Sequence, residues 1–249
     1  MGSIHELSQE GCRSKASTNT SHNETVSELI ARLQNNTDCT NPLQIYFSTD
    51  FHDEPAVIEK DTLRSLSNAF ASTFRRHTEE DERDAIAFCE YTSDTIRLFL
   101  YWLTHRRIPD IENVDTLPEP SSAQAKSDYQ LLLTRLYYFA EDKKTPALQN
   151  DAMESFVASL WETDLTLERL QTILLEAPRA CKLRLAVLDD ALWLEENEGF
   201  ELLEGLDTNE MSGLMSDMRD AKAAYDGRKG ARGKGKDYLV ADAEVAGEK

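Results

Sequence analysis

The spacing of apolar residues changes between residues 43 and 60, and that change restricts the possible folds more than any other feature. Over residues 43–48, apolar and polar side chains alternate, with Leu43, Ile45 and Phe47 on one face. Alternation predicts a half-buried strand, and the apolar run 56–58 predicts a second strand after a turn, so the two form a hairpin. From Lys60 to Phe74, apolar residues recur every three or four positions, as they do on one face of a helix. We therefore expect an α+β protein that is mainly helical.

Further elements follow from the same reading. The apolar run 85–91 predicts a third strand, after which Ser93 or Asp94 would cap a helix. The Pro- and acid-rich stretch 108–128 predicts a long exposed connection. The remaining expected helices cover residues 95–107, 128–142, 145–161, 165–177, 181–196 and, with a weaker pattern, 211–225.

Residues 1–40 are expected to form a mostly disordered arm that carries one short helix. The first 24 residues are rich in Ser, Thr and Asn, so they bury too little apolar surface to offset the entropy of ordering. Thr25 and Glu28 fit a capping box. One apolar stripe follows, made of Val26, Leu29, Ile30 and Leu33. Two interpretations remain open: the helix packs on its own chain, or it is exchanged between protomers.

The charge of the chain limits its partners. The formal net charge is −19 over 249 residues, so the surface as a whole repels nucleic acids and anionic lipids. The chain shows neither an apolar signal segment nor a run of about 18 apolar residues that spans a bilayer. The four cysteines are scattered, with no CxxC spacing. We expect an intracellular protein of the nucleus or the cytoplasm, with reduced thiols and no membrane partner.

The last residues, 226–249, differ from the rest in composition. Residues 227–236 read GRKGARGKGK, which predicts a flexible, locally basic tail. Such a tail could contact nucleic acid, act as an import signal, pair with the acidic body of the same chain, or merely aid solubility. The residues that would contact nucleic acid are Arg228, Lys229, Arg232, Lys234 and Lys236.

No pattern predicts an enzyme. The five histidines do not fall into metal-ligand spacings, and P-loop, GxSxG and GxGxxG motifs are missing. Asp50, His52 and Asp53 could attract a divalent ion, but a solvated turn explains them better. Cys181 precedes Lys182 at a helix start, so its thiol is either activated or simply buried. We expect no catalytic residue, no cofactor and no metal.

Two segments resemble the BTB/POZ family in its divergent fungal form. The first matches the pattern apolar-His-Lys-x-x-Leu-x-x-x-Ser-x-x-Phe, although Glu59 replaces the usual His and Asn68 a frequent Pro. The second is similar to a pattern in which Ala-Asp-Lys precedes a Pro-x-Leu-x-Asn step. The matching residues are Ile58, Lys60, Leu63, Ser67, Phe70, Ala140, Asp142, Lys143, Pro146, Leu148 and Asn150. Residues 181–193 also resemble the segment that follows many such domains.

The resemblance covers about residues 42–200. It implies a BTB/POZ domain over 41–162, a helical extension over 163–225 and the tail over 226–249. It also implies a non-catalytic protein-interaction module, such as a dimerising adaptor for a cullin-type ubiquitin ligase. The partners would be a second copy of the chain or a cullin scaffold. The alternative is a nuclear regulator or scaffold whose basic tail contacts nucleic acid.

Overall fold

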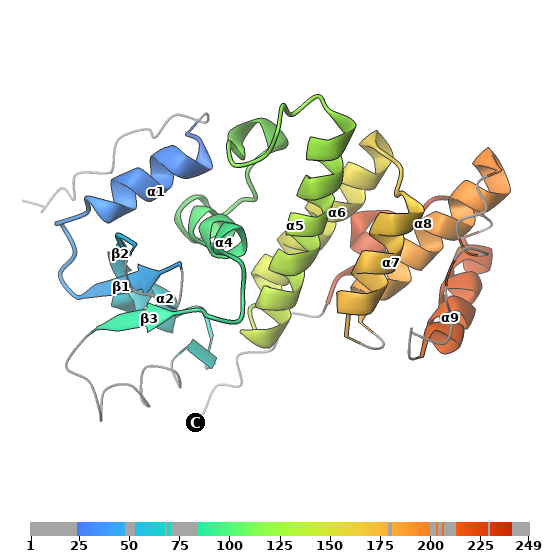
Figure 1. The fold of residues 1–249 in the computed structure, drawn as a ribbon. Coiled ribbons are helices and arrows are strands. Elements are labelled where there is room, and N and C mark those ends of the chain that lie inside the picture. Colours follow the sequence, from blue (N-terminus) through green and yellow to red (C-terminus); the bar gives the residue numbers. More distant parts are fainter. Residues whose placement is uncertain are drawn as a thin grey trace, which may run out of the picture.

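The computed structural model of the chain combines one small sheet with a long array of helices, and it confirms a mainly helical α+β fold (Figure 1). It describes residues 24–47, 53–67, 69–70, 84–178, 181–199, 203, 206, 213–228 and 230–240. The sheet has three strands in the order β2-β1-β3. The strands are β1 (Pro42–Tyr46), β2 (Ala56–Glu59) and β3 (Ala85–Ala87).

The sheet contains the expected hairpin and one pairing that the sequence did not reveal. β1 and β2 are antiparallel, with Leu43 opposite Ile58, whereas β3 runs parallel to β1, with Ile45 opposite Ile86. The predicted strand 85–91 is shorter than expected because the chain turns after β3, where the Tyr91 amide donates to the Phe88 carbonyl at 3.1 Å.

Helices α1 (Val26–Gln34), α2 (Lys60–Arg64) and α4 (Ser93–His105) accompany the sheet (Figure 1). The N-cap of α4 is Thr92, whose hydroxyl accepts from the Thr95 amide, and not Ser93 or Asp94 as predicted. Thr92 is the N-cap because its backbone is still extended, whereas Ser93 and Asp94 already belong to the helix.

The predicted capping box and apolar stripe of α1 are confirmed. Thr25 accepts from the Glu28 amide at 3.2 Å, and Glu28 accepts from the Thr25 amide at 2.9 Å. The four apolar residues of the stripe are buried, and α1 lies against β2 and α4 of the same chain. Residues 24–40 therefore belong to the folded unit rather than to a disordered arm; residues 1–23 lie outside the described part. The burial within one chain favours the packing interpretation of α1 over exchange.

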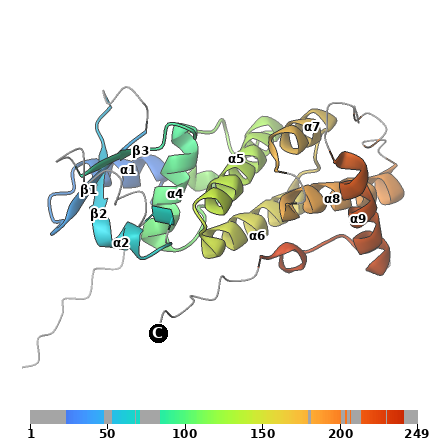
Figure 2. The ribbon, with the colours of Figure 1, turned by 90° about the horizontal axis from the view of Figure 1, so that it is seen from below.

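The second half of the described chain is helical. Its elements are η1 (Ile111–Asn113), α5 (Ala123–Asp142), α6 (Pro146–Glu162), α7 (Leu167–Glu176), α8 (Lys182–Glu198), α9 (Leu214–Gly227) and η2 (Gly235–Tyr238). The α5–α6 hairpin stands between the sheet end of the molecule and α7–α9 (Figures 1 and 2). Helix α5 begins five residues before the predicted position 128, because the Ser122 hydroxyl caps it by accepting from the Ala125 amide at 3.1 Å.

One hydrophobic core runs through all of these elements, from Val26 in α1 to Tyr238 in η2. The boundary that the sequence placed after residue 162 is therefore not a boundary between separate cores. Among the described residues, no helix is both long and apolar enough to cross a membrane.

The segment after α9 contradicts the prediction of a flexible tail. Residues 230–240, here called the strap, run back along α6 and α8 and include η2 (Figure 2). Tyr238 of the strap is buried. The prediction is wrong for residues 226–228 and for the strap, because these residues find specific partners on the helices. Lys229 and residues 241–249 lie outside the described residues.

Candidate functional site

The two segments that carry the family resemblance meet in space. Ser67 donates its hydroxyl to the Lys143 carbonyl at 2.7 Å and accepts from the Phe70 amide at 3.3 Å. The Phe70 ring stacks on Phe99 with 5.7 Å between centroids, and it lies 6.3 Å from Phe139. Ser67 and Phe70, which follow α2, thus contact the end of α5 and the turn between α5 and α6, here called the α5–α6 corner.

A second set of contacts strengthens this corner. Asp142 accepts from the Tyr91 hydroxyl at 2.6 Å and pairs with the Lys143 ammonium at 2.7 Å. The hydrogen bond from Lys143, followed by that from Tyr91, holds the pKa of the Asp142 carboxyl below its usual range. Lys143 also lies 5.1 Å from the centre of the Tyr91 ring.

The other signature residues are framework rather than surface. Pro146 occupies the first turn of α6, where a missing amide costs nothing. Glu59, which replaces the family's usual His, accepts from the amides of Thr40 at 3.0 Å and Asn41 at 2.9 Å, and so fixes the chain where it enters β1. Four further signature residues are buried in the core: Ile58, Leu63, Ala140 and Leu148.

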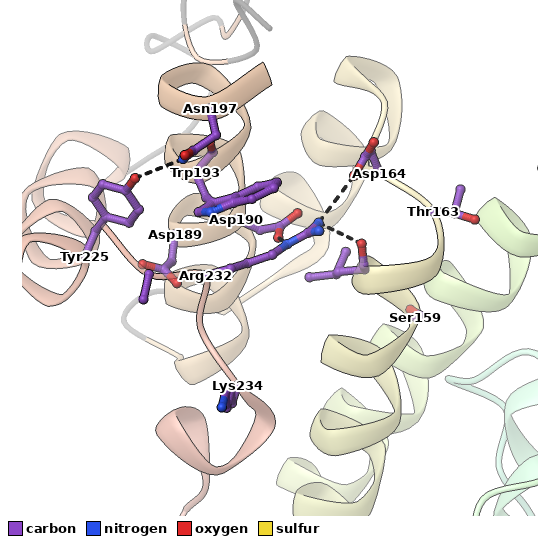
Figure 3. A network of polar contacts seen from close by, with 12 residues as sticks. Ser159, Thr163, Asp164, Asp189, Asp190, Trp193, Asn197, Tyr225, Arg232 and Lys234 are labelled. Atoms are coloured by element: carbon purple, nitrogen blue, oxygen red, sulfur yellow. Dashed lines mark hydrogen bonds and ion pairs between the residues drawn. The ribbon is translucent and has the colours of Figure 1, made fainter. Parts of the chain in front are cut away.

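The arginines predicted for a nucleic-acid tail instead bind two adjacent aspartates of α8. Arg228 pairs with Asp189. Arg232 donates from Nε to Asp190 Oδ1 at 2.6 Å (Figure 3). It also donates from Nη2 to the Leu160 carbonyl at 2.7 Å.

Aromatic rings complete the surroundings of Arg232. Its guanidinium lies 4.6 Å from the centre of the Trp193 ring and 5.4 Å from that of Trp161. A second carboxylate, Asp164, lies 3.4 Å away (Figure 3). The side chain is only 8% exposed. Carboxylate, carbonyl and ring contacts on one cation form a guanidinium pocket, defined here by Leu160, Trp161, Asp164, Asp190 and Trp193.

The rest of the strap is fixed along its length. Tyr238 donates its hydroxyl to Asp189. Asn150, a signature residue on α6, donates its amide to the Val240 carbonyl at 3.1 Å and accepts from the Val240 amide at 2.9 Å. A Cβ on Gly235 would lie 3.0 Å from the Glu154 backbone, so this glycine allows close approach to α6. The strap therefore lies in a defined place along α6 and α8, here called the groove. Gly233 and Tyr238 of the strap border one small space together with Val157, Leu160, Ala186, Asp189 and Asp190.

Burial disfavours the charged form of both aspartates. Burial raises the pKa of the Asp189 carboxyl, while Tyr238 and Arg228 oppose the rise. Burial likewise raises the pKa of Asp190 to about 6, against the opposing hydrogen bond and charge of Arg232. Asp190 Oδ2 is buried without a hydrogen-bond partner in the described part of the chain. The two buried carboxylates are thus suited to cationic partners, and burying them without such partners would be unfavourable.

This raised pKa predicts a pH dependence of stability. Between pH 4 and 6, the native state binds more protons at Asp190 than the unfolded chain does. The contribution of Asp190 to the free energy of unfolding therefore falls as the pH rises, by up to about 1.4 kcal/mol per pH unit. Urea unfolding of the wild type and of Asp190→Asn at pH 4.5, 5.5 and 6.5 measures the effect. We expect a flatter profile for the variant; parallel profiles would contradict this assignment.

The three lysines predicted to contact nucleic acid differ from the two arginines. Lys234 and Lys236 are exposed, and Lys229 lies outside the described residues. The five tail residues predicted to contact nucleic acid therefore do not form one basic surface in the part that is described.

The candidate thiol and the candidate metal cluster have different outcomes in the structure. Burial raises the pKa of the Cys181 thiol to about 11, so the buried interpretation of this residue is the better one. Within the described ranges, no group of three or more His, Cys, Asp or Glu residues could hold a metal ion. Asp50 and His52 of the suspected turn cluster lie outside those ranges. His105 contacts Glu24 at 3.0 Å.

The residue pair that sequence reasoning missed is Asp189-Asp190. It interrupts the apolar run LRLAVLDDALW, and that interruption is the signal that could have found it. Two adjacent carboxylates on an apolar helix require cations, and Arg228 and Arg232 supply them. Comparison of the chain with protein-family models, with curated proteins and with solved structures finds no match.

Proposed function

We propose that this chain is a non-catalytic protein-interaction module of the BTB/POZ kind that works as an adaptor, with a cullin-type scaffold as its partner. The observation that carries the proposal is the Ser67–Lys143 hydrogen bond together with the Phe70 stacking. It supports the resemblance because two segments matched separately in the sequence build one corner. A small sheet fixed to a helical hairpin in this way presents stable helix surfaces to other proteins.

The surface proposed for the partner is a hollow of about 230 Å³ beside the α5–α6 hairpin. Its walls come from η1 and its preceding loop on one side and from α5 and α6 on the other. They include Tyr129, Ala158 and Glu162. Tyr is one of the residue types enriched at protein-contact surfaces, and a charged side chain such as that of Glu162 suits the polar rim of one.

Self-association through α1 is not favoured. Its apolar stripe is buried within the chain, and a charge of −19 on each copy opposes a twofold contact. The nucleic-acid alternative is also disfavoured, because Arg228 and Arg232 would have to leave Asp189 and Asp190 to reach phosphate.

Binding to purified cullin N-terminal domains tests the proposal. We expect the full chain to bind at least one of them, and Ala158→Arg, which fills the hollow, to weaken binding at least tenfold. Met215→Arg on α9 is the matched control, since Met215 is 63% exposed and does not line the hollow. Sedimentation of the chain alone should give a monomer. Failure of the folded wild type to bind any cullin would refute the adaptor role.

A further inference from the structure

Arg232 is enclosed as a bound ligand would be. Its guanidinium has a carboxylate at 2.6 Å, a carbonyl at 2.7 Å and two indole rings within 5.4 Å. Arginine is the side chain that such a pocket selects, because its planar donors match these acceptors while its face lies on aromatic rings. Lysine offers one compact charge and cannot satisfy both requirements.

Helices and the turn after α6 build the guanidinium pocket, whereas the residue that fills it lies in a mostly non-helical segment. Every residue of the guanidinium pocket lies on α6, on α8 or in the turn after α6, so the helical body builds it. The occupant is a chain segment that follows the last α-helix and passes Gly230, whose φ of 73° marks a turn out of the helix direction. Its described part beyond this turn contains only the short η2, so its release would leave the helices themselves in place.

The groove also demands a basic occupant. With the strap in place, Asp189 and Asp190 are at most 4% exposed as side chains. If the strap leaves, Asp190 loses its ion-pair partner Arg232, and Asp189 loses the hydrogen bond from Tyr238. An uncompensated buried carboxylate is costly, so the groove without the strap would attract another cation. The net charge of the whole chain is −19, which adds long-range attraction for a basic segment and repulsion for a second copy.

We propose that the groove formed by α6 and α8 is a recognition site for an extended, arginine-bearing basic segment of a partner protein, and that the strap closes it in cis. This site lies outside the hollow proposed for a cullin, so either proposal can fail without the other. The strap acts as a tethered competitor. A tether of this length gives an effective concentration on the order of millimolar, so the strap masks the groove until a stronger ligand arrives.

The test uses the full chain with Arg228→Ala and Arg232→Ala, here called the open variant. These changes remove the cis cations and leave the groove side chains intact. The probe is a fluorescein-labelled peptide with the sequence of residues 226–240, and its binding is followed by fluorescence polarisation. We expect the peptide to bind the open variant at least tenfold more tightly than it binds the wild type, because only the wild type has its own competitor.

Two matched controls examine specificity. The peptide with lysine at both arginine positions should bind the open variant at least tenfold more weakly. Adding Asp190→Asn to the open variant should weaken binding of the original peptide to a similar degree. Equal binding of the lysine peptide would indicate only general attraction to an acidic surface and would overturn the proposal.

Several results would contradict the proposal directly. One is a folded open variant, verified by circular dichroism, that binds no peptide at millimolar concentration. Another is equal affinity for wild type and open variant. A concentration-dependent dimer of the wild type that the open variant lacks would assign the groove to a second copy instead of a partner.

If the open variant does not fold, hydrogen exchange of the wild type tests whether the peptide displaces the strap. Excess peptide should then increase the exchange of the strap amides, whereas unchanged exchange would overturn the proposal.

Discussion

Replacing Arg184 with alanine is expected to lower the free energy of unfolding by about 3–5 kcal/mol, the largest loss for any single substitution considered. Arg184 is buried, donates from Nε to Asp217 Oδ2 at 2.5 Å and donates from Nη1 to the Leu174 carbonyl at 2.7 Å. The substitution leaves the Asp217 carboxylate buried without its cation and leaves a carbonyl without its donor. Urea unfolding followed by circular dichroism at neutral pH measures the loss.

Two controls separate a lost charge from lost packing. The double variant Arg184→Met, Asp217→Leu removes both charges and keeps the volume, so we expect it to recover at least half of the loss. Arg135→Ala removes a comparable pair, Arg135–Glu176, whose side chains are each 36% exposed, and should cost at most about 1 kcal/mol. Equal losses for Arg184→Ala and Arg135→Ala would mean that burial of the pair does not matter.

The sequence was sufficient to predict those elements that are determined by residues close together in the chain. The capping box of Thr25 and Glu28 and the stripe of α1 are set by residues within one helix, so spacing alone located them. The hairpin of β1 and β2 was accessible for the same reason. The parallel pairing of β3 was not, since it joins residues about forty positions apart through a register that no local pattern encodes.

The strap shows where composition misleads. A segment of Gly, Lys and Arg lacks a hydrophobic face, so it is expected to stay flexible. Here the glycines permit close approach, and Arg228 and Arg232 neutralise Asp189 and Asp190, which lie about forty residues earlier in the chain. The intramolecular pairing of the tail was one open interpretation of the sequence. Choosing it required knowledge that the two aspartates are buried side by side, which depends on how α6 and α8 pack.

Gly233 provides the second large prediction. A Cβ at this position would lie 1.9 Å from the Tyr238 hydroxyl oxygen and 2.6 Å from Asp189 Oδ2, both of which are buried. Gly233→Ala must therefore push Tyr238 out of its hydrogen bond with Asp189. We expect the overpacking and the lost hydrogen bond to lower the free energy of unfolding by about 2–4 kcal/mol. Thermal unfolding measures the overall loss.

Gly227→Ala is the matched control, because a Cβ on this last residue of α9 would meet nothing within 4 Å. Alanine is favoured over glycine in a helix by up to about 1 kcal/mol, so this variant should be no less stable than the wild type. Hydrogen exchange then locates the damage. Because the atoms nearest to a Cβ on Gly233 belong to the strap and to α8, the strap amides should lose protection in Gly233→Ala while those of α5 keep it. Full protection of the strap in that variant would show that Tyr238 can move without cost, and the glycine would then not be what allows the strap to dock.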